Sequence, residues 1–242
     1  MSALLEVQNV TKSFRGLRAL GNVSFTVQSS EIVALIGPNG AGKTTLFNLL
    51  AGVLKPDAGA ILLNGRPIHG LRPDRVCALG VGRTFQIVRP FQGLSVLDNV
   101  LVGALKRAAS VAQARLHAEE ILERLGLTDR RHMPAASLTL PERKGLEIAR
   151  ALATRPSLLL LDEALAGLRP AECDPWVALL REINRRENVT ILLIEHVMRA
   201  VMALAQRVVV LHEGEIVADG VPQEVVRQRC VLECYLGEDV EL

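Results

Sequence analysis

A glycine-rich loop between a strand and a helix constrains this chain more than any other part of its sequence. The loop reads G-P-N-G-A-G-K-T-T over residues 37–45 and fits the pattern G-x-x-x-x-G-K-[ST]. The apolar, β-branched run at 31–36 predicts a buried strand, and a helical pattern continues over 43–50. Backbone N–H groups and the positive end of a helix therefore converge where a polyphosphate can bind. A plain glycine-rich turn with a solvated lysine is the weaker alternative.

Each residue type in the loop suits an anion site. Glycines allow tight turns and close approach of the backbone to an anion. We expect Lys43 to reach the terminal phosphates and Thr44 to offer its hydroxyl to Mg²⁺. The residues expected to contact the nucleotide are Gly37, Pro38, Asn39, Gly40, Ala41, Gly42, Lys43, Thr44 and Thr45.

A second signal is a run of four leucines followed by two acids, over residues 158–163. The leucines predict a buried parallel strand, and Asp162 and Glu163 emerge at its carboxyl end, where ligand sites of open α/β sheets lie. There an aspartate can hold Mg²⁺ while the adjacent carboxylate polarises a water molecule for attack on a phosphate. Adjacent acids at a strand end are often only solvated, but the glycine-rich loop favours catalysis.

Three single residues are further candidates. Phe14 lies in a polar stretch, where it could stack on an adenine ring or serve as a small core anchor, and the sequence leaves both open. Gln86 follows a short apolar segment and could contact a metal ion or its water, although solvated glutamines are common. His196 follows an apolar strand at 189–194 and could contact a γ-phosphate; its role depends on this context.

The rest of the chain alternates strands and helices. Residues 95–126 have helical periodicity, and a further helix is expected at 142–153, with Thr139 and Glu142 as a capping box and Pro141 in the first turn. Other expected elements are strands at 4–10, 23–27 and 60–65, a helix at 171–186, a hairpin of 208–211 with 216–218, and a terminal helix at 223–236.

Composition narrows the function classes. The chain has 28 Lys and Arg against 26 Asp and Glu, so its charge gives no argument for nucleic acid as a partner. Its hydrophobic fraction is 49%, but the apolar runs are too short to cross a bilayer. The first residues do not form a charged and then apolar leader, so we expect a cytoplasmic location.

Taken together, these stretches resemble the ATP-binding subunit of an ABC transporter over essentially the whole chain. The loop at 37–45 looks like its Walker A motif, and 158–162 looks like its Walker B strand. By the same resemblance, Phe14 stacks on adenine, Gln86 is the Q-loop residue, Glu163 is the catalytic carboxylate and His196 is the switch histidine. Segments 82–86, 146–152, 166–168, 194–198 and 235–238 are most similar to branched-chain amino-acid importers, a pattern that urea and aromatic-acid importers share.

The resemblance implies an α/β P-loop NTPase fold in one ABC ATPase domain, residues 1–242. It has a RecA-like core, an antiparallel β subdomain within 1–89, a helical subdomain at 90–155, and the rest of the core with a C-terminal helix at 156–242. Two ATPase subunits would close head-to-tail around two ATP and Mg²⁺ and drive transmembrane permease subunits, with a solute-binding protein upstream. Such a subunit is peripheral, on the cytoplasmic face of the membrane. The alternative is a non-transport ABC ATPase acting on nucleic acid or another assembly; a single compact cassette without a basic stripe favours transport.

One motif departs from the family. The signature is usually L-S-G-G-Q, but this chain has Leu138, Thr139, Leu140, Pro141 and Glu142 in its place. In addition, Arg169 replaces the usual Asp or Asn of the D-loop, and Ala164 replaces the proline after the catalytic glutamate. The residues that act on the chain's own nucleotide are intact, whereas the signature and D-loop departures face the partner's nucleotide. We therefore expect a heterodimer with a different ATPase chain. The alternative is that Thr139 and the helix N-terminus suffice and the substitutions are neutral.

Overall fold

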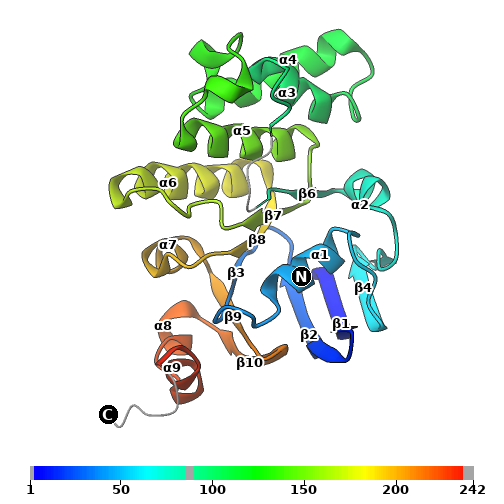
Figure 1. Cartoon of the computed structure of the whole chain (residues 1–242). Helices are drawn as coiled ribbons and strands as arrows, with labels where there is room; N and C mark the ends of the chain where they lie inside the picture. The colour runs from blue at the N-terminus through cyan, green and yellow to red at the C-terminus, as the bar shows by residue number, and fades with distance from the viewer. Residues whose placement is uncertain (1–2, 86–89, 237–242) are drawn as a thin grey trace.

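The computed structural model describes residues 3–85 and 90–236 and places them in two sheets with helices around them (Figure 1). The strands are β1 (Ala3–Phe14), β2 (Leu17–Gln28), β3 (Ile32–Ile36), β4 (Ala58–Leu63), β5 (Arg66–Pro67), β6 (Val81–Arg83), β7 (Leu158–Asp162), β8 (Thr190–Ile194), β9 (Arg207–His212) and β10 (Glu215–Gly220). The helices are α1 (Lys43–Leu50), α2 (Pro73–Leu79), α3 (Val96–Ala104), α4 (Val111–Arg124), α5 (Leu140–Ala153), α6 (Pro170–Glu187), α7 (Met198–Leu204), α8 (Pro222–Val225) and α9 (Arg229–Leu236). This arrangement confirms the expected α/β class.

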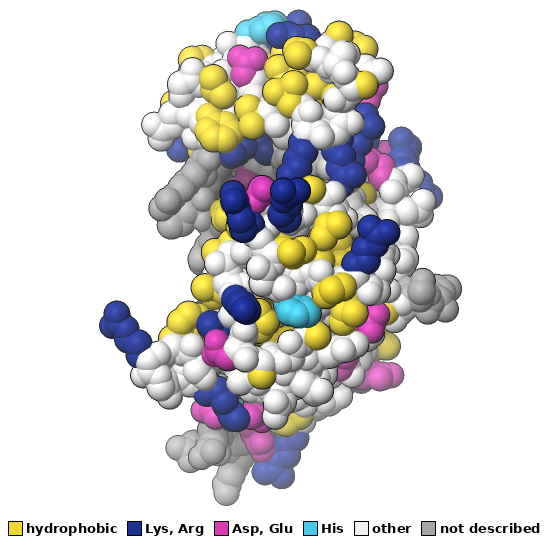
Figure 2. All heavy atoms as spheres, turned by 90° about the vertical axis from the view of Figure 1, so that its right-hand side faces the viewer, with side chains coloured by type: hydrophobic (Ala, Val, Ile, Leu, Met, Phe, Trp, Pro, Cys, Tyr) yellow, Lys and Arg dark blue, Asp and Glu magenta, His cyan; other side chains and the backbone are white. Residues whose placement is uncertain are grey.

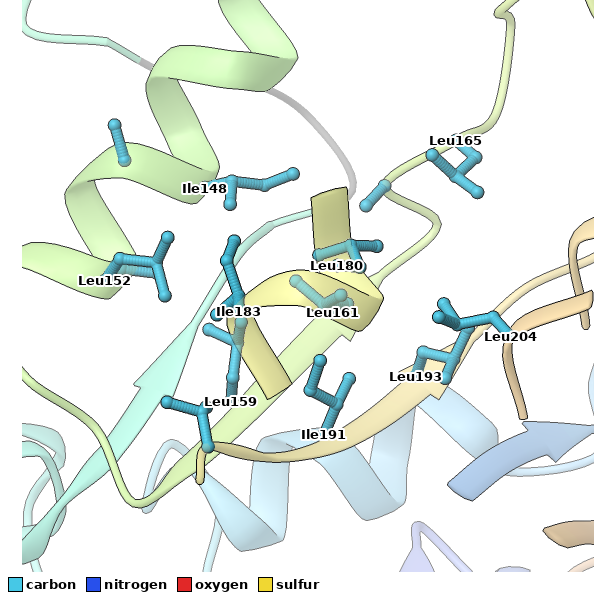
Figure 3. Packing of buried hydrophobic residues seen from close by; sticks show 14 of the residues in the cluster. Ile148, Leu152, Leu159, Leu161, Leu165, Leu180, Ile183, Ile191, Leu193 and Leu204 are labelled. Carbon is cyan, nitrogen blue, oxygen red and sulfur yellow. The ribbon is translucent and has the colours of Figure 1, made fainter. Parts of the chain in front are cut away.

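The larger sheet has six strands in the order β10-β9-β3-β8-β7-β6, and all neighbours are parallel except β9 and β10. Its central strands are apolar throughout because both faces are covered. In β7, Leu159 and Leu161 belong to one hydrophobic cluster, while Leu158 and Leu160 belong to the cluster on the opposite face. Figure 3 shows the first cluster, where side chains of β7 and β8 meet those of α5, α6 and α7.

The smaller, antiparallel sheet has the order β2-β1-β4-β5. Asn64 and Gly65 have φ of 50° and 70°, which fits the tight turn expected between β4 and β5. A similar turn at Arg15 and Gly16 joins β1 to β2, so both strands are longer than the sequence pattern indicated. Phe14 consequently ends a strand next to a turn.

Helices α3, α4 and α5 pack on one another at one end of the molecule (Figure 1). Helix α5 also joins the hydrophobic cluster on the large sheet, through Ile148 and Leu152 among others, so these helices share a core with the sheet. The boundaries of the helical subdomain at 90 and 155 remain a prediction.

The single terminal helix expected at 223–236 was wrong, because the chain forms α8 and α9 there, separated at residues 226–228. Val225 and Val231 are both buried in the same cluster. Six residues apart, they would point about 120° away from each other around one continuous helix, and the break lets both face the same core. Short helices α2 and α7 had no counterpart in the sequence analysis. No helix within the described residues combines the length and apolarity that crossing a bilayer requires.

Candidate functional site

The glycine-rich loop, Glu163 and His196 line one cavity of about 240 Å³. They come together because β8 lies between β3 and β7 and pairs with both in parallel. The carboxyl ends of the three strands therefore meet at one edge of the large sheet. The lining residues are Ala19, Asn39, Gly40, Ala41, Gly42, Lys43, Thr44, Thr45, Glu163 and His196. The convergence expected from separate sequence segments is thus present.

The loop has the tight geometry that an anion site requires. Gly37 has a φ of 148°, and a Cβ there would lie 1.9 Å from the carbonyl oxygen of Leu211. Gly42 has a φ of 104°, and a Cβ would lie 2.5 Å from the carbonyl oxygen of Ala19. Only glycine fits at either position, so the curl that brings the backbone round to the start of α1 depends on both.

Lys43 points into this curl. Its Nζ donates to the carbonyl oxygens of Gly37 at 2.6 Å and Pro38 at 2.9 Å, and the residue is only 6% exposed. Burial lowers the pKa of Lys43, while Glu163 and Asp162 oppose that shift. A phosphate group here would satisfy an ammonium that the protein otherwise holds with neutral carbonyl groups.

Glu163 and His196 form a pair beside the loop. His196 Nε2 lies 3.3 Å from Glu163 Oε1. Glu163 has a φ of 51°, in the left-handed region, and its N–H donates to Ile194 O at 2.9 Å, which ties the end of β7 to the end of β8. Strained backbone of this kind clusters at functional sites. The pair can orient a water molecule and accept its proton.

Asp162 is buried near the loop, and its two carboxylate oxygens have different surroundings. The residue is 2% exposed; its Oδ2 accepts a hydrogen bond from Arg83 Nη2 at 2.9 Å, and its N–H donates to Thr84 Oγ1 at 3.0 Å. Oδ1 is buried and has no partner among the described residues. Burial raises the pKa of Asp162, and Arg83 opposes that shift. Thr44 lines the cavity, whereas Asp162 lies just behind it, next in the chain to the lining residue Glu163. An unpaired carboxylate oxygen and a nearby hydroxyl are suited to a Mg²⁺ ion that would take its other oxygens from phosphate and water.

Two of the other predicted site features, Phe14 and the signature segment, do not line this cavity. Phe14 is 42% exposed, which excludes the core-anchor interpretation, and it does not line the cavity, so adenine stacking stays a prediction. Gln86 lies outside the described residues. The signature segment, residues 138–142, does not line the cavity of its own chain.

The signature segment is bonded to itself instead. Glu142 Oε2 accepts from Thr139 N at 2.8 Å, which is the contact that Glu142 makes in a capping box, and it also accepts from Thr139 Oγ1 at 2.9 Å. Glu142 Oε1 accepts from Arg130 Nε at 2.7 Å, and this bond is the main cause that lowers the pKa of Glu142. A carboxylate therefore already occupies the N-terminus of α5.

Sequence reasoning missed two buried cations near the site, Arg83 and Lys144. Arg83 ends β6, which pairs with the apolar β7, and Lys144 lies on the buried side of α5. Arg83 could have been found, because a charged residue at the end of a short apolar strand is a sequence signal. Lys144 has no such signal, because its partners come from other segments of the chain.

Comparisons with known proteins bear on this geometry. The family model described as ABC transporter matches residues 20–166. The chain is 41% identical to the high-affinity branched-chain amino acid transport ATP-binding protein LivG of Salmonella typhimurium, over 97% of this chain and 98% of LivG. It is 40% identical to BraF of Pseudomonas aeruginosa, which carries the same description, with the same coverage. The crystal structure of the ADP conformation of an ATP-binding cassette of an ABC transporter superposes with a TM-score of 0.89 at 30% identity, covering 98% of this chain and 100% of that one.

Proposed function

Because this chain belongs to the ABC transporter family of ATPases, we propose that it powers the import of branched-chain amino acids. The observation that carries ATP hydrolysis is the single cavity that joins Lys43 and the glycine-rich loop to the pair of Glu163 and His196. The solute class rests on the likeness to LivG and BraF over nearly the whole chain.

Each residue of the cavity has a distinct part in this function. The backbone N–H groups of the loop and Lys43 bind the β- and γ-phosphates of ATP. Thr44 and Asp162 would hold Mg²⁺, which would neutralise charge on the phosphates. Glu163 orients the attacking water and takes its proton, and His196, 3.3 Å from it, fixes the carboxylate and contacts the γ-phosphate. Gln86 and Phe14 keep their expected roles at the metal and the adenine ring.

The transmembrane partner has a suitable surface on this chain. A second cavity of about 260 Å³ lies between α2, β6, α3 and α5 and is lined by Phe85, Phe91, Val102 and Arg150 among others. Phe85 is 55% exposed, and Phe91 and Val102 are exposed as well, although large apolar side chains favour burial. Figure 2 shows the side of the molecule that carries α2, with hydrophobic side chains on its upper part and a band of Lys and Arg side chains below them. We assign this groove to the permease subunit, on the cytoplasmic face of the membrane.

A second, different ATPase chain completes the proposed assembly. Because Pro141 has no N–H and Glu142 already caps α5, this helix start offers a poor site to the γ-phosphate on a partner chain. A partner with an intact signature would give the dimer one good composite site.

The test uses the full complex. The chain is co-expressed with its neighbouring permease and ATPase subunits, reconstituted in proteoliposomes with the solute-binding protein, and assayed for ATP-dependent uptake of labelled leucine. The Glu163→Gln variant should retain ATP binding, slow hydrolysis by about two to four orders of magnitude and abolish uptake. Near-normal hydrolysis in that variant would refute the catalytic assignment. ATP turnover without a co-purifying membrane subunit would instead favour the non-transport alternative.

A further inference from the structure

Arg83 is a buried cation that the proposed reaction does not yet use. Its side chain is 8% exposed, and its Nη2 bonds Asp162 Oδ2 at 2.9 Å. Its Nη1 donates to Asn48 Oδ1 at 2.7 Å, on the helix that follows the phosphate loop. Arg83 therefore ties the loop helix α1 to the carboxylate at the end of β7.

The guanidinium is further held by two aromatic rings. Its Cζ lies 5.9 Å from the centre of the Phe47 ring and 5.2 Å from that of Phe85. Two hydrogen bonds and two ring contacts leave a planar fork little freedom, so Arg83 fixes the orientation of the carboxylate it binds. A lysine has no such fork and would not hold both oxygen partners in the same way.

As a consequence, the two carboxylate oxygens of Asp162 differ in their partners. Oδ2 is occupied by Arg83, while Oδ1 is buried without a partner in the described part of the chain. Partners that bond to a metal-binding side chain commonly orient it and are required for full metal affinity. A buried carboxylate without Arg83 would lose both its compensating charge and its orientation.

We propose that Arg83 is a positioning residue for the divalent cation of the ATP complex, because it holds Oδ2 of Asp162 and thereby presents Oδ1 to the metal. This inference rests on the proposed function, since the metal arrives with ATP. Arg83 and Phe85 also line the groove assigned to the permease, so the residue that orients the metal-binding carboxylate borders the surface where a partner would dock.

The experiment measures the contribution of the metal to nucleotide binding rather than turnover. The full chain carries Glu163→Gln to slow hydrolysis, and its ATP affinity is measured by calorimetry with EDTA and again with Mn²⁺. The dissociation constant with EDTA divided by that with Mn²⁺ gives the Mn²⁺ ratio, which is compared among variants. Electron paramagnetic resonance of the bound Mn²⁺ reports its ligands. Arg83→Met should lower the ratio about 10- to 100-fold, the range found when an outer partner of a metal ligand is lost. It should also alter the Mn²⁺ spectrum.

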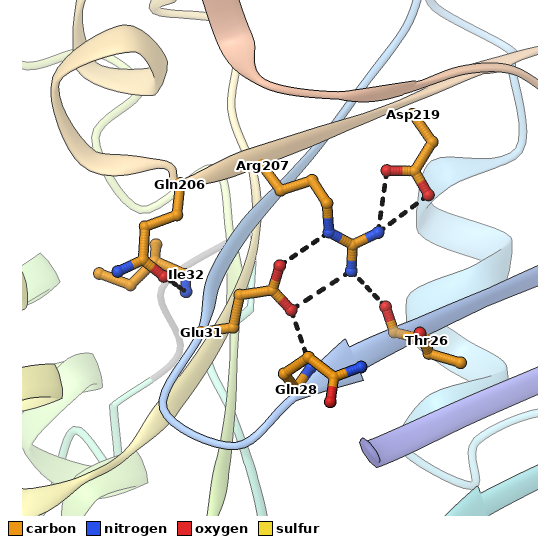
Figure 4. Close-up of polar contacts among 7 residues, drawn as sticks. All are labelled: Thr26, Gln28, Glu31, Ile32, Gln206, Arg207 and Asp219. Carbon is orange, nitrogen blue, oxygen red and sulfur yellow. Dashed lines mark hydrogen bonds and ion pairs between the residues drawn. The ribbon is translucent and has the colours of Figure 1, made fainter. Parts of the chain in front are cut away.

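A matched control separates positioning from stability. Arg207 is also partly buried and bonded to carboxylates, Glu31 and Asp219, but in a network at β2, β9 and β10 (Figure 4). Arg207→Met should lower the melting temperature without changing the Mn²⁺ ratio. If Arg83→Met does not fold, Arg83→Lys carries the test, because it keeps the positive charge and loses the planar guanidinium. Its Mn²⁺ ratio should fall less than that expected for Arg83→Met.

The outcomes separate the two proposals. A ratio in the folded Arg83 variant that stays within about twofold of the Arg207→Met ratio, with an unchanged spectrum, would overturn the positioning role and leave Arg83 a structural residue. Tighter Mn²⁺ binding in the variant would overturn it too, because Arg83 would then compete with the metal. Absence of ATP binding by the unsubstituted chain would refute the proposed function itself.

Discussion

The ammonium group of Lys144 lies 2.9 Å from the backbone carbonyl oxygen of Glu163. Lys144 is in the second turn of α5, the helix that begins with the signature segment, and it is almost fully buried. Burial lowers the pKa of Lys144, and the nearby carboxylates of Glu195, Glu147 and Glu163 oppose that shift. The bond joins the helix that would face the partner's nucleotide to the backbone of the catalytic residue on this chain.

Replacing Lys144 with Met should therefore impair hydrolysis more than binding. Loss of a charged hydrogen bond costs about 1.5–3 kcal/mol, which corresponds to a fall in kcat of roughly 10- to 100-fold if the bond holds Glu163 in its strained conformation. ATP affinity should stay within about twofold, because Lys144 does not line the nucleotide cavity. Steady-state turnover and calorimetric binding are measured together. The neighbouring Arg143→Ala serves as control, since the Arg143 side chain, in the part of the chain that the structure describes, donates to the carbonyl oxygens of Leu138 and Ala136 and not to Glu163. Equal turnover in both variants would contradict the prediction.

Lys43→Ala should weaken ATP binding by about one to two orders of magnitude, since a charge-assisted contact to the phosphates is lost. The fold should survive, because the hydrogen bonds of Lys43 to described residues run to two carbonyl groups of the loop itself. Calorimetry with ATP checks the affinity, and the exposed Lys55→Ala is the control for loss of a positive charge elsewhere. Unchanged affinity in a folded Lys43→Ala protein would refute the site assignment.

These residues also show what the sequence can and cannot predict. The phosphate loop and the two acids at the end of β7 were predictable, because each is a short contiguous segment with residue types specific to its chemistry, next to elements of clear periodicity. His196 was predictable only in that context. Arg83 and Lys144 were not, because their partners Asp162 and Glu163 lie far along the chain and meet them only through sheet and helix packing. The break between α8 and α9 was missed for the same reason, since it depends on which residues the core buries.

His117 should make the fold sensitive to mild acid. Burial is the main cause that lowers its pKa, and Arg155 adds to the shift, against a smaller opposing effect of Glu120. Above pH 6.5 the imidazole is neutral in the folded and the unfolded chain and does not change the stability. Below pH 6.5 the unfolded chain binds a proton more readily than the folded one. The free energy of unfolding therefore falls as the pH falls toward the pKa of the folded state. His117→Gln should remove this loss. Chemical denaturation at pH 7.5 and pH 5.5 checks it, and an equal loss in both proteins would contradict the prediction.

Restoring the signature should raise the activity of the isolated chain. The start of α5 is occupied by Glu142, whose carboxylate bonds Thr139 twice and Arg130 once, and Pro141 lacks the N–H that a γ-phosphate would accept from. A homodimer carries this defect at both composite sites, whereas a heterodimer with an intact signature on the other chain keeps one good site. Leu140→Gly, Pro141→Gly and Glu142→Gln together should free the helix start.

The expected gain in turnover for the lone chain is about 10- to 100-fold, the equivalent of one recovered charge-assisted hydrogen bond. ATP turnover is measured for the original and restored chains, each alone and mixed with the neighbouring ATPase. Mixing should stimulate the original chain strongly and the restored chain much less, because the restored homodimer already has complete sites. Arg130→Ala, which frees Glu142 from one bond but leaves its charge at the helix start, should give little gain. If the lone original chain already turns over as fast as the restored one, the departures at 140–142 are neutral and the asymmetric assembly is refuted.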